Sequence, residues 1–391
     1  MRILVTSMVD LRKAAHNRIH QFVKHLSPNH EITVLSINDW WKAGQTDVKL
    51  YTKDLEKILQ KAEIRYFTGR ETSPIFQELF SFMNIERLLK EIDYRQFDIH
   101  LNCGTLVSGY MVARKMKSIG VETIYDIADN NPEMIRNSPQ IPSPLRPAGG
   151  LFGSMMLRRN IRIARRIIYV TTAIKESCHI PEHKSDCVPN GVDTSLFRNH
   201  SSEQLRDELG LAGKFVIGYV GVLREWVKLE PIFAVVRQLE ESHPEIRVLI
   251  VGQEGRFQEN KDLAKAYGIA DKVIFTGTVP YAQVPSYISC MDVCTVPFEI
   301  NRVTNDPCPL KLFEYMACER PVISALEITA AGNNILHAFS TEEYRHRILE
   351  LHGDQTLRRR LGSEGRRFVE QNYDWAKISS NLEKILIDVA S

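Results

Sequence analysis

The chain has 391 residues, of which 43% are hydrophobic and 25% charged. This is the composition of a globular protein of two or three domains, and it excludes a disordered chain, a collagen and a coiled coil. Fifty Lys and Arg against 48 Asp and Glu give a formal net charge of +2, which lacks the basic excess of a dedicated nucleic-acid binder. The seven cysteines are scattered without a Cys-x-x-Cys pair, so we expect no disulfide framework and a cytoplasmic protein.

The first residues do not read as a targeting segment, because their apolar run is short and charge returns at Asp10, Arg12 and Lys13. No stretch approaches the roughly 20 apolar residues that a membrane-spanning helix needs. We therefore expect a soluble protein, or one attached to the inner face of a membrane only at its surface.

Short β-branched runs alternate with amphipathic segments of helical length along the whole chain. Those of the first half are 2–5, 31–37, 98–103, 122–126, 166–171 and 185–189. Those of the second half are 215–222, 246–252, 272–276, 293–297, 320–325 and 333–337. Alternating strands and helices indicate parallel sheets, and so many strands are too many for one ordinary open sheet. We predict an α/β fold of two tandem doubly wound, Rossmann-like domains.

The polar, helical stretch 197–211 carries no strand and marks the domain boundary. We expect a first domain at 1–200, a second at 201–372 and a C-terminal helix within 373–391, preceded by a long helical stretch over 342–371. Open α/β sheets bind ligands at the carboxyl ends of their strands.

The stretch 306–324, DPCPLKLFEYMACERPVIS, is the most informative part of the chain. Pro309 suits the first turn of a helix that runs to about Cys318. Lys311 and Glu314 are three residues apart and point the same way, and a helix N-terminus with a lysine suits a phosphate. Glu314 would accept hydrogen bonds from ribose hydroxyls. The alternative is a solvated polar face, including Tyr315, on which Lys311 and Glu314 form a surface pair.

This stretch resembles the signature of glycosyltransferase family 4, a GT-B family whose two acidic residues stand eight apart. Asp306 and Glu314 occupy those two places, and EYMACERPV resembles the run that follows. Asp306 stands where the family usually has Glu, and Glu319 stands where it has Gly. Other ordered motifs that resemble the family are 188–197, 218–230, 273–279 and 368–375.

The resemblance implies the GT-B architecture, with a last helix that crosses back to the first domain and a nucleotide-sugar donor bound by the second. The residues that it assigns to the donor are Gly221, Arg224, Lys228, Pro309, Leu310, Lys311 and Glu314. Asp306 would hold the donor sugar as a catalytic residue. The alternative for Arg224 and Lys228 is a solvated loop in which they pair with Glu225 and Glu230.

On the acceptor side, the run YDIADNNP resembles the family's loop after a first-domain strand. Asp126 and Asp129 are its candidates to orient the acceptor or act as a base, although such carboxylates are equally often turn or cap residues. Ala128 stands where relatives commonly have His. Arg18 would face the acceptor or be solvated.

Two segments, 75–83 and 151–168, are amphipathic, and the second carries five arginines. Basic amphipathic helices bind anionic membranes, so peripheral membrane contact is one interpretation. Packing against the core is the more frequent one.

The resemblance implies a retaining glycosyltransferase that moves a sugar from a UDP- or GDP-linked donor to a glycan, a lipid-linked molecule or another hydroxyl acceptor. No Asp-x-Asp sequence occurs, so we predict no metal requirement and no other cofactor. The alternatives are a nucleotide-sugar epimerase of the same architecture and a non-catalytic sugar-binding or nucleotide-binding scaffold.

Overall fold

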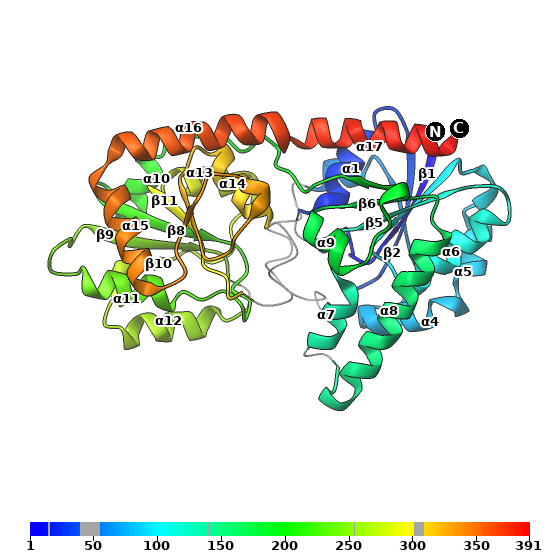
Figure 1. The fold of residues 1–391 in the computed structure, drawn as a ribbon, viewed down its shortest axis with the longest axis horizontal. Helices are drawn as coiled ribbons and strands as arrows, with labels where there is room; N and C mark the ends of the chain where they lie inside the picture. Colours follow the sequence, from blue (N-terminus) through cyan, green and yellow to red (C-terminus); the bar gives the residue numbers. More distant parts are fainter. Residues whose placement is uncertain (15, 40–54, 139–140, 254, 301–308) are drawn as a thin grey trace. The chain divides into compact units, whose positions relative to one another are not determined.

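The computed structural model describes all residues except 15, 40–54, 139–140, 254 and 301–308 (Figure 1). The described chain divides into two compact units. Unit 1 comprises Met1–Asn190 together with Ala376–Ser391, and unit 2 comprises Gly191–Trp375. Each unit holds one parallel sheet with helices around it (Figure 1).

Unit 1 contains a seven-stranded sheet in the order β3-β2-β1-β4-β5-β6-β7. Its strands are β1 (Arg2–Ser7), β2 (Glu31–Ser36), β3 (Glu63–Tyr66), β4 (Ile99–Cys103), β5 (Thr123–Ile127), β6 (Arg166–Tyr169) and β7 (Ser185–Cys187). Its helices are α1 (Arg18–Leu26), α3 (Glu56–Leu59), α4 (Pro74–Phe80), α5 (Ile85–Glu91), α6 (Val107–Lys117), α7 (Asn131–Asn137), α8 (Arg146–Ile163) and α9 (Thr172–Ser177).

Unit 2 contains a six-stranded sheet in the order β10-β9-β8-β11-β12-β13. Its strands are β8 (Phe215–Val220), β9 (Ile246–Val251), β10 (Val273–Phe275), β11 (Val293–Val296), β12 (Val322–Ser324) and β13 (Leu336–His337). Its helices are α10 (Glu203–Glu208), α11 (Glu230–Gln238), α12 (Phe257–Ala266), α13 (Val284–Ser289), α14 (Leu310–Ala317), α15 (Thr341–Gly353) and α16 (Gln355–Asn372).

The predicted fold class is confirmed, because both sheets are parallel and their strands alternate with helices. The central strands are buried on both faces, and every residue of β4, β5 and β8 is buried. Continuous apolar runs are typical of strands buried in this way. The strand β3 was missed, because Glu63–Tyr66 contains one isoleucine and lies at the sheet edge.

The long helical stretch predicted over 342–371 consists of two helices, α15 and α16. Asp354 ends α15, and its carboxylate Oδ1 accepts the backbone N–H of Leu357 at 2.8 Å to cap α16. Because Asp favours the N-cap position, a new helix begins here instead of the first one continuing.

The final helix, α17 (Trp375–Ala390), contributes Ala376–Ser391 to unit 1. Glu383 Oε1 lies 2.7 Å from His30 Nε2 and accepts the amide of Asn29 at 3.1 Å. Leu382 and Leu386 are fully buried. Apolar and polar contacts thus hold the C-terminal segment on the first sheet's unit. Among the described helices, none is both long and apolar enough to cross a membrane.

Candidate functional site

Three glycines follow the carboxyl ends of adjacent strands in unit 2. Gly221, Gly252 and Gly277 have φ values of 129°, 133° and 75°, a region that side chains rarely tolerate. The amide of Gly252 donates to the carbonyl of Gly277 at 2.9 Å, and a Cβ on Gly252 would lie 2.4 Å from the Gly221 oxygen. These three glycines, called the glycine edge below, therefore let the segments that follow the strands pack closely against neighbouring protein atoms.

The helix α14 begins beside this glycine edge. Pro309 precedes it in an extended conformation, and Leu310 is its first residue. Leu312, Phe313, Met316 and Ala317 are buried in the core of unit 2. Tyr315 is also fully buried, so its predicted place on the polar face was wrong. Its hydroxyl accepts the backbone N–H of Val220 at 2.8 Å, which satisfies the polar end of the ring inside the core.

Lys311 lies half-buried in the first turn of α14. Its Nζ donates to the hydroxyl of Tyr219 at 2.7 Å and lies 4.2 Å from that ring's centroid. The ring of Phe298 is 4.9 Å away. Burial lowers the pKa of Lys311 to about 7, and the charge of Glu314 opposes that fall. The ammonium is thus held over aromatic rings without a carboxylate partner within ion-pair distance in the described chain.

Glu314 is half-buried one turn further along α14. The hydroxyl of Tyr281 donates to its Oε1 at 3.3 Å. Burial raises the pKa of Glu314 to about 7, while Lys311 and the Tyr281 hydrogen bond oppose the rise. Lys311 and Glu314 therefore contact two different tyrosines and do not form the solvated surface pair of the alternative interpretation.

The loop after β8 carries two further cationic candidates. Arg224 is exposed, and its charge opposes the rise that burial causes in the pKa of Tyr219. The Tyr219 hydroxyl donates to the carbonyl of Val222 at 2.9 Å, which ties Lys311 to this loop. Lys228 Nζ forms an ion pair with Glu299 Oε2 at 3.1 Å. The structure thus brings Lys311, Gly221 and Arg224 to one edge, whereas a neighbouring carboxylate offsets the charge of Lys228.

Asp306 lies outside the described residues. Within the described ranges, no three His, Cys, Asp or Glu side chains lie close enough together to hold a metal ion.

The helix α14 ends in a turn that the usual glycine would favour. Glu319 occupies that place with φ 57°, and its N–H donates to the carbonyl of Met316 at 3.0 Å. Arg320 N–H donates to the carbonyl of Tyr315 at 3.0 Å. These two bonds form a Schellman motif. The turn into β12 is therefore retained with Glu in a left-handed conformation.

The acceptor-side candidates lie in unit 1, after β5. Asp126 is buried, and its two oxygens accept Arg18 Nε at 2.9 Å and Nη2 at 3.0 Å. Burial raises the pKa of Asp126, and Arg18 opposes that rise. Arg18 also donates to the carbonyl of Pro189 at 2.8 Å, so it is not solvated. Asp129 is exposed in the loop, and Ala128 packs against the adjacent core.

Sequence reasoning missed Tyr219, Tyr281, Gly252 and Gly277 as parts of the candidate site. The run VGQEG at 251–255 follows a strand and resembles the run VG at 220–221 that follows β8, so a signal for the second glycine was present. No local pattern marks the two tyrosines, because only the tertiary fold brings them to Lys311 and Glu314.

Comparison with known proteins bears on unit 2 first. Residues 201–368 match the family described as glycosyl transferases group 1. The matching region contains the glycine edge as well as Lys311 and Glu314 of α14.

Relatives and solved structures extend the likeness. Spore coat protein SA of Bacillus subtilis is 25% identical over 235 residues, which are 55% of this chain. The match spans 61% of that relative, so the chain covers about three fifths of its length. Sucrose-phosphate synthase from Thermosynechococcus elongatus has the same fold, with a TM-score of 0.76 at 16% identity over 99% of this chain and 98% of that one. Anabaena HepE, solved in complex with UDP and glucose, has a TM-score of 0.70 at 16% identity over 99% of this chain and all of its own.

Proposed function

We propose that this protein is a retaining glycosyltransferase that moves a sugar from a UDP- or GDP-linked donor to a hydroxyl group of a glycan or lipid-linked acceptor. Unit 2 binds the donor and unit 1 the acceptor. The observation that carries the proposal is the arrangement of Lys311 and Glu314 beside the Gly221 edge, inside the region that matches glycosyl transferases group 1. HepE, which shares the fold, was solved with UDP, and this supports a nucleotide-sugar as co-substrate.

The donor's diphosphate would lie against the glycine edge and the start of α14. Lys311 and Arg224 would supply positive charge, with Lys228 as a further cation once its pairing with Glu299 is exchanged for phosphate. Free backbone N–H groups after Pro309, from Leu310 onward, favour an anion at the helix N-terminus. Protein cations would thus take the place of a metal ion.

The rest of the donor would be held by carboxylates. Glu314 accepts hydrogen bonds when ionised, which suits two ribose hydroxyls, and Tyr281 orients its carboxylate. Asp306 would hold hydroxyls of the transferred sugar. In unit 1, Asp129 is the accessible carboxylate for an acceptor hydroxyl, while Asp126 would act through Arg18 to shape the loop.

In the reaction, the bond between the sugar's anomeric carbon and the diphosphate oxygen breaks, and a bond from that carbon to the acceptor oxygen forms. The acceptor's proton leaves with the departing diphosphate or with a carboxylate of unit 1. Negative charge develops on the diphosphate. Fixed cations directed at that charge stabilise the transition state.

Calorimetric titration tests the donor site. Wild-type protein and Glu314→Ala are titrated with UDP, GDP and ADP, first without metal and then with magnesium. One nucleotide should bind without metal, at least tenfold more weakly to the variant. Glu241→Ala, which changes an exposed glutamate in the same unit, should bind like the wild type. If the wild type and Glu314→Ala bound every nucleotide equally, or if neither bound any nucleotide, the proposed donor site would be wrong.

Product analysis separates the alternatives. Incubation of the selected sugar nucleotide with glycan and lipid-linked acceptors should release free nucleotide and form a glycoside. NMR coupling at the anomeric carbon should show the donor's configuration in the product. An epimerised sugar nucleotide would identify an epimerase, and tight binding without turnover of any acceptor would favour a scaffold.

A further inference from the structure

The helix α4 of unit 1 has its apolar side chains outside and its polar side chains inside. Phe76, Leu79 and Phe80 expose 53%, 44% and 42% of their surface, whereas Gln77 and Glu78 expose 4% and 5%. A helix on a globular protein normally turns its apolar face to the core. The following turn, η2 (Ser81–Met83), adds Phe82 and Met83, which are also exposed.

Buried hydrogen bonds hold α4 in this orientation. The Oε2 atom of Glu78 accepts the backbone N–H groups of Leu106 and Val107 at 3.1 and 2.8 Å, and Ser108 donates through both its N–H and its hydroxyl to the same carboxylate. A carboxylate at the N-terminus of α6 is favourable. Gln77 Oε1 accepts the N–H of Asn38 at 2.8 Å. These hydrogen bonds therefore fix the outward orientation of the apolar face, since turning the helix over would break them.

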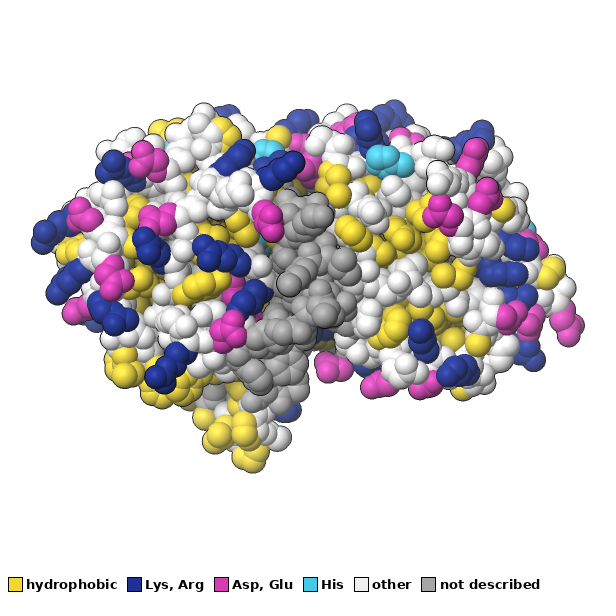
Figure 2. Space-filling model, turned by 180° about the vertical axis from the view of Figure 1, so that it is seen from behind, with side chains coloured by type: hydrophobic (Ala, Val, Ile, Leu, Met, Phe, Trp, Pro, Cys, Tyr) yellow, Lys and Arg dark blue, Asp and Glu magenta, His cyan; other side chains and the backbone are white. Residues whose placement is uncertain are grey.

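A second exposed apolar group lies at the free end of the α7–α8 pair. Leu145 and Leu151 expose 59% and 70% of their surface, and Phe152 and Met155 expose 37% and 39%. This end projects from unit 1, and hydrophobic side chains gather on it (Figures 1 and 2). Both α4 and α8 pack against α6, so one helix links the two elements that carry these apolar groups.

Positive charge accompanies this end of the unit. Residues 141–168 contain six arginines and no Asp, Glu or Lys. Arg158, Arg159 and Arg162 are exposed and form no ion pair in the part of the chain that the structure describes.

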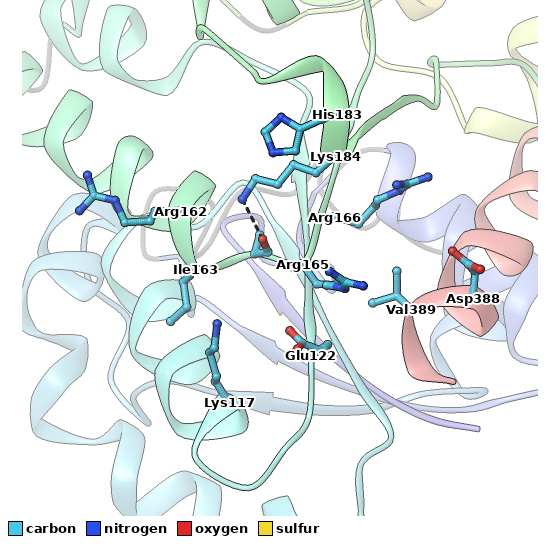
Figure 3. A pocket seen from close by; sticks show the side chains of 11 residues that line it. Lys117, Glu122, Arg162, Ile163, Arg165, Arg166, His183, Lys184, Asp388 and Val389 are labelled. Atoms are coloured by element: carbon cyan, nitrogen blue, oxygen red, sulfur yellow. Dashed lines mark hydrogen bonds between the residues drawn. The ribbon is translucent and has the colours of Figure 1, made fainter.

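Lys and Arg outnumber Asp and Glu in the lining of two cavities along α8. A cavity of about 480 Å³ is bordered by Lys117, Arg162, Arg165, Arg166 and Lys184, with Glu122 and Asp388 as its acidic residues (Figure 3). A cavity of about 600 Å³ on the neighbouring side is bordered by Arg136, Arg158, Arg162 and Lys184, with Glu133 as its acidic residue. Burial and the charge of Lys117 lower the pKa of Lys184. An anion in either cavity would relieve repulsion among these groups.

The spacing along α8 matches the profile of a bilayer surface. A helix rises 1.5 Å per residue, so Arg158 stands about 10 Å behind Leu151. Interfacial apolar side chains enter a bilayer by roughly 5–10 Å. Leu151, Phe152 and Met155 would therefore reach the acyl chains while Arg158 and Arg159 lie at the depth of the lipid phosphates.

We propose that unit 1 docks on a bilayer rich in anionic phospholipid through two apolar contacts, α4–η2 and the free end of α8, with the arginines of α8 binding lipid phosphates. Charge complementarity selects this occupant, because an apolar protein partner would not require an arginine-rich segment without acids. Docking on a membrane would present a lipid-linked acceptor to the proposed glycosyltransferase. Only this statement about the acceptor rests on the proposed function.

Vesicle flotation with the full chain tests the proposal. Large unilamellar vesicles of phosphatidylcholine, with and without 30% phosphatidylglycerol, are floated at low and high salt. The wild type should float with the anionic vesicles at 0.1 M NaCl, and this binding should fall at least fivefold at 0.5 M because salt screens the arginines. Equal binding to neutral vesicles, or no binding to either, would overturn the proposal.

Variants locate the surface. Leu151→Ser with Phe152→Ser, and separately Phe76→Ser with Phe80→Ser, should each reduce vesicle binding at least tenfold. Arg158→Glu with Arg159→Glu should do the same. The control pair Phe339→Ser and Ile387→Ser changes exposed apolar residues elsewhere and should bind like the wild type. Since all these side chains are exposed, circular dichroism should show a folded chain in each case.

Two further outcomes are decisive. If the apolar variants bind vesicles normally but dissociate a dimer seen by sedimentation velocity, the surface binds a second copy and the proposal is wrong. Glu314→Ala should bind vesicles like the wild type. If the wild type bound vesicles but no nucleotide, the proposed function would be wrong and the proposed docking surface would still be supported.

Discussion

The ammonium of Lys311 lies against Gly221 so closely that a Cβ on the glycine would stand 2.8 Å from Nζ. Gly221 also has φ 129°. The glycine therefore serves two purposes, since it permits the backbone turn after β8 and leaves room for the lysine.

Gly221→Ala should weaken UDP or GDP binding at least tenfold, because the methyl group displaces the Lys311 ammonium. Backbone strain should also lower the free energy of unfolding by roughly 1–3 kcal/mol. Calorimetry and urea titration measure the two effects. Gly213→Ala is the matched control, since Gly213 has φ 66° and no atom within 4 Å of its added Cβ. Gly213→Ala should lose stability through backbone strain alone and should bind nucleotide like the wild type. If it bound nucleotide as weakly as Gly221→Ala, displacement of Lys311 would not explain the weaker binding.

Nucleotide binding should weaken as the pH rises from 6 to 9 when it is measured in a Glu314→Gln background, in which the other group with a pKa of about 7 no longer titrates. Burial lowers the pKa of Lys311 to about 7, so the free protein loses this charge in that range, and a bound diphosphate should raise the pKa again. Binding at pH 7.5 should therefore take up a proton. Calorimetry in two buffers of different ionisation enthalpy measures the uptake. Lys311→Met should bind more weakly at pH 6 and show a flatter profile, whereas an unchanged profile would exclude Lys311 as the titrating group.

Glu314→Gln should stabilise the ligand-free protein at pH 8 but not at pH 4. Burial raises the pKa of Glu314 from 4.5 to about 7, so between these values the folded protein holds a proton that the unfolded chain has released. The unfolding free energy of the wild type therefore falls as pH rises through this window. The variant avoids this loss and should gain about 1 kcal/mol above pH 7, after allowance for solvent screening.

Urea titration at both pH values measures this gain, and Glu241→Gln should show no pH-dependent difference from the wild type. The same Glu314→Gln change should weaken nucleotide binding, because an amide is a poorer acceptor for ribose hydroxyls. Stability and binding would then move in opposite directions, as is common where a site is built at a cost in stability. A variant that lost stability at pH 8 would contradict the explanation that burial of the ionised Glu314 carboxylate destabilises the fold.

Removing one partner of the Arg18–Asp126 pair should cost about 3–5 kcal/mol of stability, since it leaves a buried charge without its partner. Arg18→Met with Asp126→Leu should cost less than either single change. Urea unfolding of the four proteins gives the coupling free energy. Additive effects would show that the bidentate contact does not hold the loop after β5.

The strand pattern was readable from the sequence because buried parallel strands need continuous apolar runs. The twelve predicted segments include β1 and β8, and among the strands of the described residues only the short edge strand β3 was missed. The break at Asp354 was missed, because helical propensity continues on both sides and only the capping bond reveals it.

The candidate site was predicted in part. Lys311 and Glu314 were identified from their spacing and from the resemblance of the surrounding motif, and Gly221 from the resemblance of the motif at 218–230. The chain alone could not show that Glu319 adopts the left-handed turn expected of glycine, since the strain is tolerated only within the Schellman motif.

By itself, the sequence determined the two-sheet architecture and the residue types available to bind phosphate and ribose. Tertiary structure decided which side chains meet, because Tyr219 and Tyr281 are 92 and 33 residues from their partners Lys311 and Glu314. It also decided that Arg18 is buried against Asp126 and that α4 faces outward. Local patterns record periodicity and propensity, whereas these contacts depend on long-range packing and on where buried polar groups find hydrogen-bond partners.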